Sequence, residues 1–250
     1  MQNALNLKRW VPMLGVMACW FALAGCPGLL RPYRLFNYLP LVQGNSWSFG
    51  CVAADTGQTV ASQELSVSKV MLVAGKTVWV TSQKSIPSDG SAPTYSGDVY
   101  YVFHSDVLYS TNSLRAVEDL PDSLDTAFKA VVHDDLTPRE IDDANDPVVK
   151  QHEAAIRYSA GALEDFLPIA FVRQGKDGVS SASGAVDIAD FGEGLRDLAD
   201  CIALETNANG DWTPAYIFGR DVGPLLAPDG IGGYVALQSA NVRCALKETP

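Results

Sequence analysis

The amino-acid sequence predicts a mainly β fold: an antiparallel meander, in the form of a curved sheet or half-barrel, with a small helical insertion. Hydrophobic residues alternate at Leu65, Val67, Met71 and Val73, which is the period of a strand with one buried face. Short turn signals separate the predicted strands, so chain neighbours should pair antiparallel. Strands do not alternate with long helices, and there is no glycine-rich phosphate loop.

The first predicted strand runs from Ser46 to Ala53, after turn signals at Pro40 and Gly44-Asn45. Ala74-Gly75-Lys76 leads into a β-branched and aromatic run, which indicates a hairpin. Further glycine-containing turns are expected at 175–178, 209–211 and 229–230. The remaining predicted strands are 99–102, 107–109, 169–173, 185–189, 195–205, 212–218 and 234–244.

Residues 118–161 differ from this β pattern and are predicted to form an acidic, partly helical insertion or lid. Thr137-Pro138-Arg139-Glu140 fits a helix start, and Asp146-Pro147 fits a second one. The second helix should run to Gly161, because five residues would then share one face. These residues are Val148, Val149, His152, Ile156 and Ser159.

The N-terminal residues have the pattern of a signal peptide. Lys8 and Arg9 precede an apolar run, Trp10 to Ala24, that is short for a membrane span. The run closes on Leu23-Ala24-Gly25-Cys26, which resembles the lipobox of bacterial lipoprotein signal peptides. The resemblance implies cleavage before Cys26, a diacylglycerol on its sulfur, and an acyl chain such as palmitate on its new amine.

This resemblance implies three parts: a signal peptide at 1–25, a lipidated tether at 26–37 and a single domain at 38–250. Three acyl chains on Cys26 would make release from the membrane negligible. Pro27 follows the cysteine where an Asp would suggest inner-membrane retention, so we prefer the outer membrane, facing the periplasm. Plain secretion and an uncleaved membrane anchor are the alternatives.

The domain also resembles a diffuse group of uncharacterised bacterial lipoproteins that open with Pro-Leu-x-x-Gly-Asn-x-Trp-x-Tyr/Phe. Here the segment is 40–49. The other matching pieces are the 73–80 hairpin, the aromatic strands 99–102 and 107–109, Asp200-Cys201, and Gly219 followed by 220–224. The resemblance implies an all-β body and brings no known activity. The long acidic middle departs from the pattern.

Composition limits the partners and the cysteine chemistry. The chain has 250 residues and a net charge of −11, which becomes −13 when Lys8 and Arg9 leave with the signal peptide. This acidity argues against nucleic acid. An exported compartment is oxidising, so we favour a Cys201–Cys244 disulfide, with Cys51–Cys244 second. Three unpaired buried cysteines are the alternative.

No catalytic, cofactor or metal motif is evident. His152-Glu153-x-x-Ile156 has Ile where a zinc protease needs its second histidine, and there is no Gly-x-Ser-x-Gly nucleophile elbow. His104 and His133 are the other histidines. The acids of 134–146 could offer oxygens to calcium, but their spacing is irregular and lacks a glycine. We expect a solvated acidic surface there.

The sequence therefore predicts a non-enzymatic lipoprotein of the cell envelope that binds or scaffolds other molecules. The first alternative is a half-barrel carrier of a lipid or other hydrophobic ligand, with a cavity under 118–161. The second is a hydrolase in which His104 or His133 meets Ser and Asp. We expect the aromatic side chains of 99–109 to fill the sheet's apolar face, because protein interiors leave few voids.

Overall fold

The computed structural model describes residues 33–52, 59–87, 91–174, 180–208, 210–229 and 233–243. Tyr33–Pro250 forms one compact unit, and every residue of the buried core lies at or after Leu35. The unit therefore has a hydrophobic core of its own. The lipobox residues Leu23, Ala24, Gly25 and Cys26 lie outside the described residues.

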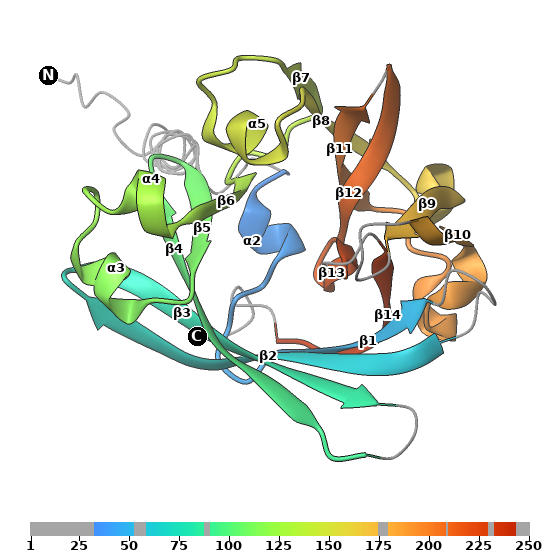
Figure 1. The fold of residues 1–250 in the computed structure, drawn as a ribbon, viewed down its shortest axis with the longest axis horizontal. Helices are drawn as coiled ribbons and strands as arrows, with labels where there is room; N and C mark the ends of the chain where they lie inside the picture. The colour runs from blue at the N-terminus through green and yellow to red at the C-terminus, as the bar shows by residue number, and fades with distance from the viewer. Residues whose placement is uncertain are drawn as a thin grey trace, which may run out of the picture. The chain divides into compact units, whose positions relative to one another are not determined.

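A single 12-stranded antiparallel sheet dominates the unit (Figure 1). Its strand order is β6-β5-β4-β3-β2-β1-β14-β13-β12-β11-β8-β7. The strands of the first half are β1 (Ser46–Val52), β2 (Thr59–Val73), β3 (Lys76–Pro87), β4 (Thr94–His104), β5 (Val107–Thr111) and β6 (Lys129–His133). Those of the second half are β7 (Arg139–Ile141), β8 (Ile156–Gly161), β11 (Cys201–Ala208), β12 (Asp211–Gly219), β13 (Gly223–Pro228) and β14 (Tyr234–Asn241).

The strand order confirms the predicted antiparallel meander. β1 to β6 are neighbours in chain order, and so are β11 to β14. The two runs meet where β1 pairs with β14, with Trp47 opposite Ala240 and Cys51 opposite Val235. Two further strands, β9 (Ile169–Gln174) and β10 (Ser180–Val186), lie between β8 and β11 in the chain. They form a separate two-stranded hairpin.

Two-residue turns fix the register of the first run. Ala74 and Gly75 both have positive φ, at 47° and 78°, and so do Ser105 and Asp106, at 48° and 63°. Two consecutive positive φ values are the mark of a type I′ turn, whose twist matches that of the flanking strands. The expected 74–76 hairpin is confirmed, and the aromatic strands β4 and β5 form a second hairpin of this kind.

The sheet curves around the short helix α2 (Leu35–Tyr38), which lies inside the curve (Figure 1). The edge strands β6 and β7 are joined by residues 134–138 alone. The N-terminal segment binds this connection, because Leu35 N donates to Asp134 O at 2.8 Å and Leu136 N donates to Tyr33 O at 2.8 Å. The two edge strands therefore lie near each other, and α2 lies between these edges and the central strands of the sheet.

The tether and insertion boundaries need correction. Leu35 and Tyr38 are only 1% and 0% exposed, so residues 33–37 belong to the domain and not to a tether. Residues 118–161 are not an insertion either, because they supply both edge strands of the sheet, β6 and β7, and also β8, which lies beside β7.

One of the two predicted helix starts is correct. Asp146 caps α5 (Pro147–His152) by accepting hydrogen bonds from Val148 N and Val149 N. The last residue of the helix is His152, and the next residue, Glu153, has a φ of +52°. The helix therefore does not reach Gly161. Residues 156–161 form β8 instead, and the start predicted at Thr137-Pro138 opens strand β7.

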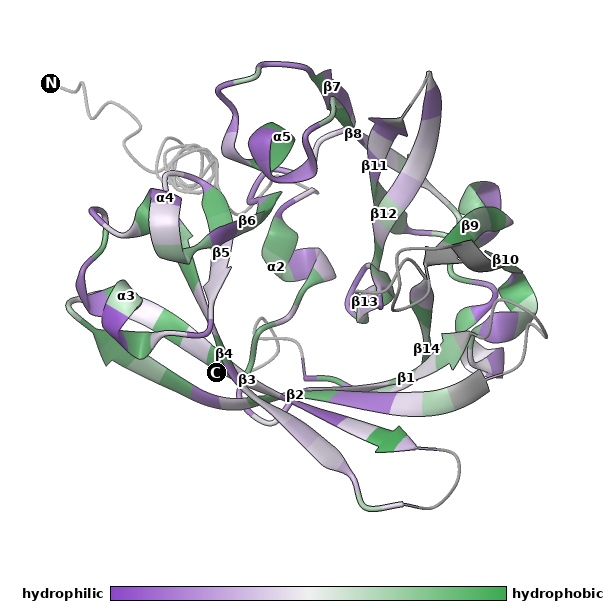
Figure 2. Cartoon of the chain, in the orientation of Figure 1, coloured by the Kyte–Doolittle hydropathy of each residue, from purple (hydrophilic) through white to green (hydrophobic). Residues whose placement is uncertain are grey.

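The other helices are short. They are α3 (Leu114–Glu118), α4 (Leu124–Ala127) and the 3₁₀ turns η3 (Leu163–Phe166), η4 (Ile188–Asp190) and η5 (Glu193–Leu195). η4 and η5 occupy positions where we expected parts of the strands 185–189 and 195–205. Residues of alternating hydropathy run along the central strands (Figure 2), as a sheet with one apolar face requires.

Candidate ligand-binding cavity

A cavity of about 300 Å³ lies on the inner face of the curved sheet. Most of its lining is apolar and comes from both arms of the sheet and from the segment after α2. The apolar lining residues are Leu39, Leu41, Trp47, Phe49, Leu65, Val131, Phe218, Pro224, Ala227, Pro228 and Val235. The face is therefore not completely packed, contrary to our expectation.

The strand period explains how the chain builds this lining. Trp47 and Phe49 stand two residues apart on β1, opposite Leu65 and Gln63 of β2, and all four line the cavity. Ser46, Ser48, Glu64 and Ser66 are their neighbours in the chain, and they point to the other face. We expected the cavity to lie under 118–161. It lies elsewhere, because Val131 is the only residue of that segment that lines it.

Four of the five polar lining residues lie on β2, β3 and β4, namely Gln63, Thr81, Gln83 and Tyr101. The fifth, Tyr216, lies on β12. The side-chain nitrogen of Gln83 donates to the side-chain oxygen of Gln63 at 2.9 Å, and the Thr81 hydroxyl donates to Val99 O at 3.4 Å. The cavity thus has a few hydrogen-bonding groups among mostly apolar walls, which is the usual composition of a small-molecule site.

Two tyrosine hydroxyls lie in this cavity. Burial, with a smaller effect of the nearby Tyr216, raises the pKa of Tyr101 to about 12. Burial also raises the pKa of Tyr216, whose ring stacks on Phe218 with centroids 6.1 Å apart. Both phenols therefore stay protonated at neutral pH and can donate or accept hydrogen bonds.

A second hollow, of about 490 Å³, lies on the opposite face of the same strands. Its lining is mostly polar, with Ser46, Ser48, Ser66 and the ion pair of Lys84 and Glu64, whose charged atoms are 3.3 Å apart. Hydroxyls and charges that water already solvates give little reason to bind an apolar ligand. The inner cavity is therefore the candidate site.

The matched sequence motifs have a structural role beside the cavity. The Trp47 indole nitrogen donates to Val222 O at 2.6 Å. Gly223 packs so closely on this ring that a Cβ there would lie 2.4 Å from the indole nitrogen. The opening Asn-x-Trp segment and the late Val-Gly-Pro segment are thus fastened together.

Asn45 and Tyr38 extend this contact. The Asn45 side chain donates to Pro40 O at 2.7 Å and accepts from Arg243 N at 2.8 Å, which ties the end of β14 to the start of β1. The Tyr38 hydroxyl donates to Asp200 at 2.7 Å and accepts from Arg220 at 3.0 Å.

His133 is the centre of a polar cluster that lies outside the cavity. Its ring nitrogens lie 2.8 Å from the Tyr158 hydroxyl and 2.9 Å from an Asp146 carboxylate oxygen. A serine hydrolase would need Ser where Tyr158 stands, and burial raises the pKa of that phenol. The cluster joins β6, α5 and β8, so it holds the two edges of the sheet together.

The other histidines do not form a comparable cluster. His104 ends β4. His152 ends α5 and packs edge-on against Tyr216, with centroids 6.4 Å apart, and burial lowers its pKa. Within the described residues, no group of three His, Cys, Asp or Glu side chains is placed to hold a metal ion.

The acids of 134–146 mostly serve local structure. Asp134 pairs with Arg34, Asp135 accepts from Thr137 N, and Asp143 accepts from Asn145 N. Such contacts are made by turns and caps without a metal ion.

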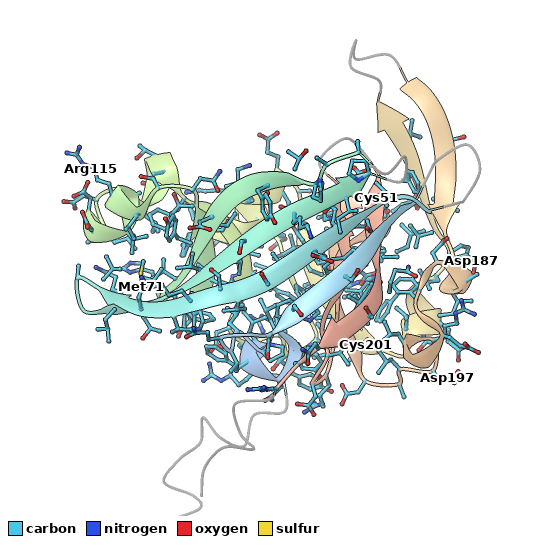
Figure 3. The ribbon with its side chains drawn as sticks, turned by 90° about the horizontal axis from the view of Figure 1, so that it is seen from below. Cys51, Met71, Arg115, Asp187, Asp197 and Cys201 are labelled. Carbon is cyan, nitrogen blue, oxygen red and sulfur yellow. The ribbon has the colours of Figure 1, made fainter. Side chains whose placement is uncertain are left out.

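The favoured cysteine pair remains a prediction, because Cys244 lies outside the described residues. Cys201 is a buried thiol whose pKa burial raises to about 12. Cys51 lies on β1 and Cys201 on β11, and three strands separate them in the sheet (Figure 3). Arg243, which precedes Cys244, is bound to Asn45 at the opposite end of β1 from Cys51.

Sequence reasoning missed most of the cavity. We expected Tyr101, among the aromatic side chains of 99–109, to help fill the apolar face, and no local pattern assigned a role to Gln63, Gln83 or Tyr216. One local signal was present. Gln63, Thr81 and Gln83 are polar residues at the alternate strand positions where buried apolar residues are expected. Polar groups on an otherwise apolar face need a reason to be there.

Comparisons with known proteins give two structural likenesses. No protein-family model matches the chain, and no curated protein sequence matches it significantly. One solved structure, from Bacteroides fragilis, is provisionally described as an exported protein with a YmcC-like fold. It is 9% identical, with a TM-score of 0.33, and the match covers 82% of this chain and 98% of that one.

A second solved structure, provisionally described as a lipoprotein from Parabacteroides distasonis, is 10% identical, with a TM-score of 0.34. The match covers 82% of this chain and 99% of that one. Likenesses at this level carry no argument about function, which has to come from the residues of this chain. None of the helices described here has the length and apolar character to cross a bilayer.

Proposed function

We propose that the protein is a lipid-anchored, non-enzymatic protein of the bacterial cell envelope that binds a hydrophobic ligand inside its curved sheet. The inner cavity of about 300 Å³ carries this proposal. Its volume is at the lower end of the range of about 300–1,000 Å³ for small-molecule sites. Its lining resembles theirs, with apolar walls and a few polar groups on one side.

The lipid anchor is argued from Leu23-Ala24-Gly25-Cys26. Cys26→Ser should abolish the incorporation of labelled palmitate and leave uncut precursor, because the thiol is the acceptor of the diacylglycerol. Unchanged palmitate labelling in this variant would sink the anchor part of the proposal. Cell fractionation of the labelled protein then separates outer from inner membrane.

Ligand binding can be tested on residues 33–250, which have their own core. A neutral apolar dye, N-phenyl-1-naphthylamine, should gain fluorescence with the unaltered domain. Ala227→Phe should abolish that gain, because Ala227 lines the cavity and the larger side chain would fill it.

The matched control is Ser239→Phe, since Ser239 is exposed, pairs with Ser48 of the outer face and lines the outer hollow. Both variants should keep the circular dichroism of a folded β protein. Equal dye binding in the two folded variants would contradict binding in the inner cavity and would return the domain to a scaffolding role.

The hydrolase alternative draws on the His133 cluster and has weaker support. Asp146 and His133 are placed like two members of a triad, but the third group is a phenol that burial keeps protonated. Removing one proton from such a group is costly near neutral pH. The geometry supports a structural cluster better than a nucleophile.

A further inference from the structure

We infer that the inner cavity selects an uncharged amphiphile, one that has a hydrogen-bonding head, such as a monoacylglycerol, over a fatty acid anion or a cationic detergent. The inference rests on the proposed function and names the ligand class of the same site. Two observations carry it: the described lining residues hold no charge, and four of the five polar ones lie on one side of the cavity.

Charge is absent from the lining. None of the described residues that line the cavity is Lys, Arg, His, Asp or Glu. An ion that enters such a site loses part of its hydration and gains no opposite charge in return, so a neutral ligand is favoured. The ion pair of Glu64 and Lys84 cannot supply that charge, because both residues line the hollow on the other face of the sheet.

Most of the polar groups lie on one side. Gln63, Thr81, Gln83 and Tyr101 lie on β2, β3 and β4, whereas the lining from β1, β13 and β14 is apolar, and Tyr216 of β12 is the one polar residue from the opposite arm. An elongated ligand with one polar end fits this division, because its chain can lie against the apolar side while its head reaches the polar side. A pure hydrocarbon would leave the amides facing apolar atoms.

The amide pair has hydrogen-bonding capacity to spare. One hydrogen bond joins Gln83 to Gln63, and among the described residues the side-chain nitrogen of Gln63 donates to no acceptor. A carboxamide has two donors and an acceptor with two lone pairs. Both side chains are half-buried, so a ligand that lies against them displaces their water. An ester, amide or hydroxyl head can replace the lost hydrogen bonds, whereas a hydrocarbon cannot.

The hydroxyls of the two lining tyrosines also favour a neutral head group. Tyr101 and Tyr216 approach the cavity from opposite arms of the sheet, on β4 and β12. Their raised pKa values keep both as neutral hydroxyls. A neutral phenol can donate to a carbonyl oxygen or accept from a hydroxyl, so it matches a glycerol ester without any change of charge.

The test displaces N-phenyl-1-naphthylamine from residues 33–250 at pH 8 with three ligands of equal chain length, each kept below its micelle concentration. They are monodecanoylglycerol, decanoate and decyltrimethylammonium. We expect monodecanoylglycerol to displace the dye at a concentration at least tenfold lower than either ion. Gln63→Leu should remove most of that advantage, measured on the folded variant by the same displacement.

Ser66→Ala is the matched control, since Ser66 lies on the same strand and lines the outer hollow. It should leave the preference unchanged. If the dye does not bind the unaltered domain, the proposed function fails, and this inference fails with it. If the dye binds but decanoate displaces it as well as the neutral ester does, ligand binding stands and only this inference is overturned. An unchanged preference in folded Gln63→Leu also overturns it.

Discussion

At the scale of single residues, the motif positions and the cavity positions do different work. Asn45, Gly223 and Arg220 hold chain segments together through hydrogen bonds and close packing. Trp47 takes part in these contacts and also lines the cavity. Gln63, Gln83 and Tyr101 line a space and have polar atoms to offer a ligand. Substitutions in the first set should therefore change stability, and those in the second should change binding.

Gly223→Ala should destabilise the domain by more than about 2 kcal/mol. Gly223 has φ +110°, and an added Cβ would lie 2.4 Å from the Trp47 indole nitrogen. Urea unfolding measures the loss. Gly194→Ala is the control, because no heavy atom lies within 4 Å of a Cβ built there. Similar losses in both variants would mean that the contact with Trp47 is unimportant.

Tyr101 should make the domain less stable at high pH. Its pKa is raised to about 12 in the folded protein from about 10 in an unfolded chain. The folded state thus favours the proton, so this contribution is complete below about pH 10 and is lost as the pH rises through about 12.

Tyr101→Phe should flatten the fall of the unfolding free energy between pH 10 and pH 12, measured by urea titration at several pH values. Tyr95→Phe is the control, since that side chain is 70% exposed. A slope that Tyr101→Phe leaves unaltered would show that the phenol does not titrate in the cavity as described.

At the scale of elements, hairpins and caps are local features, whereas the edge strands depend on distant partners. The turns at 74–75 and 105–106 and the Asp146 cap of α5 form within a few residues. β7 has only three residues and pairs with β8, and β8 pairs with β11 some forty residues later. Short strands of this kind have little intrinsic stability.

Asp146→Ala should cost about 2–3 kcal/mol, because it removes two interactions at once. The side chain caps α5, which contributes about 1 kcal/mol, and it forms a hydrogen bond with the ring of the buried His133. Thermal unfolding measures the loss. Asp142→Ala, at an exposed position in the same acidic segment, should change the unfolding free energy by less than about 0.5 kcal/mol.

At the scale of the whole domain, one open sheet is curved until its two edges lie near each other. The connection at 134–138, the Arg34 bridge to Asp135 and the His133 cluster all join these edges. The enclosed space contains α2 and the cavity. Loosening the edge contacts should therefore open the inner face as well as lower the stability.

Tyr158→Phe should lower the unfolding free energy by about 1–3 kcal/mol, since the hydroxyl contacts both the backbone and the ring nitrogen of His133. Hydrogen exchange should speed up in β6 and β8 and not in β2 and β3. Tyr100→Phe, a half-buried tyrosine of β4, is the control. Uniformly faster exchange across the sheet would contradict a local role at the edges.

The sequence alone was sufficient for features that neighbouring residues decide. Alternating hydropathy predicted the mainly β fold, Ala74-Gly75-Lys76 predicted a hairpin, and Asp146-Pro147 predicted a helix start, all of which the structure contains. The lipobox prediction at Cys26 likewise rests on adjacent residues, and palmitate labelling of Cys26→Ser tests it. Each of these signals lies within one turn or one strand.

Only the tertiary structure decided the rest. Val148, Val149, His152 and Ile156 fit one helical face, yet Ile156 belongs to β8, because pairing with β11 buries it completely. The cavity too depends on distances between β1–β4 and β12–β14, which the curvature of the sheet determines. Such pairing and curvature depend on contacts between residues far apart in the chain, and no local pattern encodes their free energy.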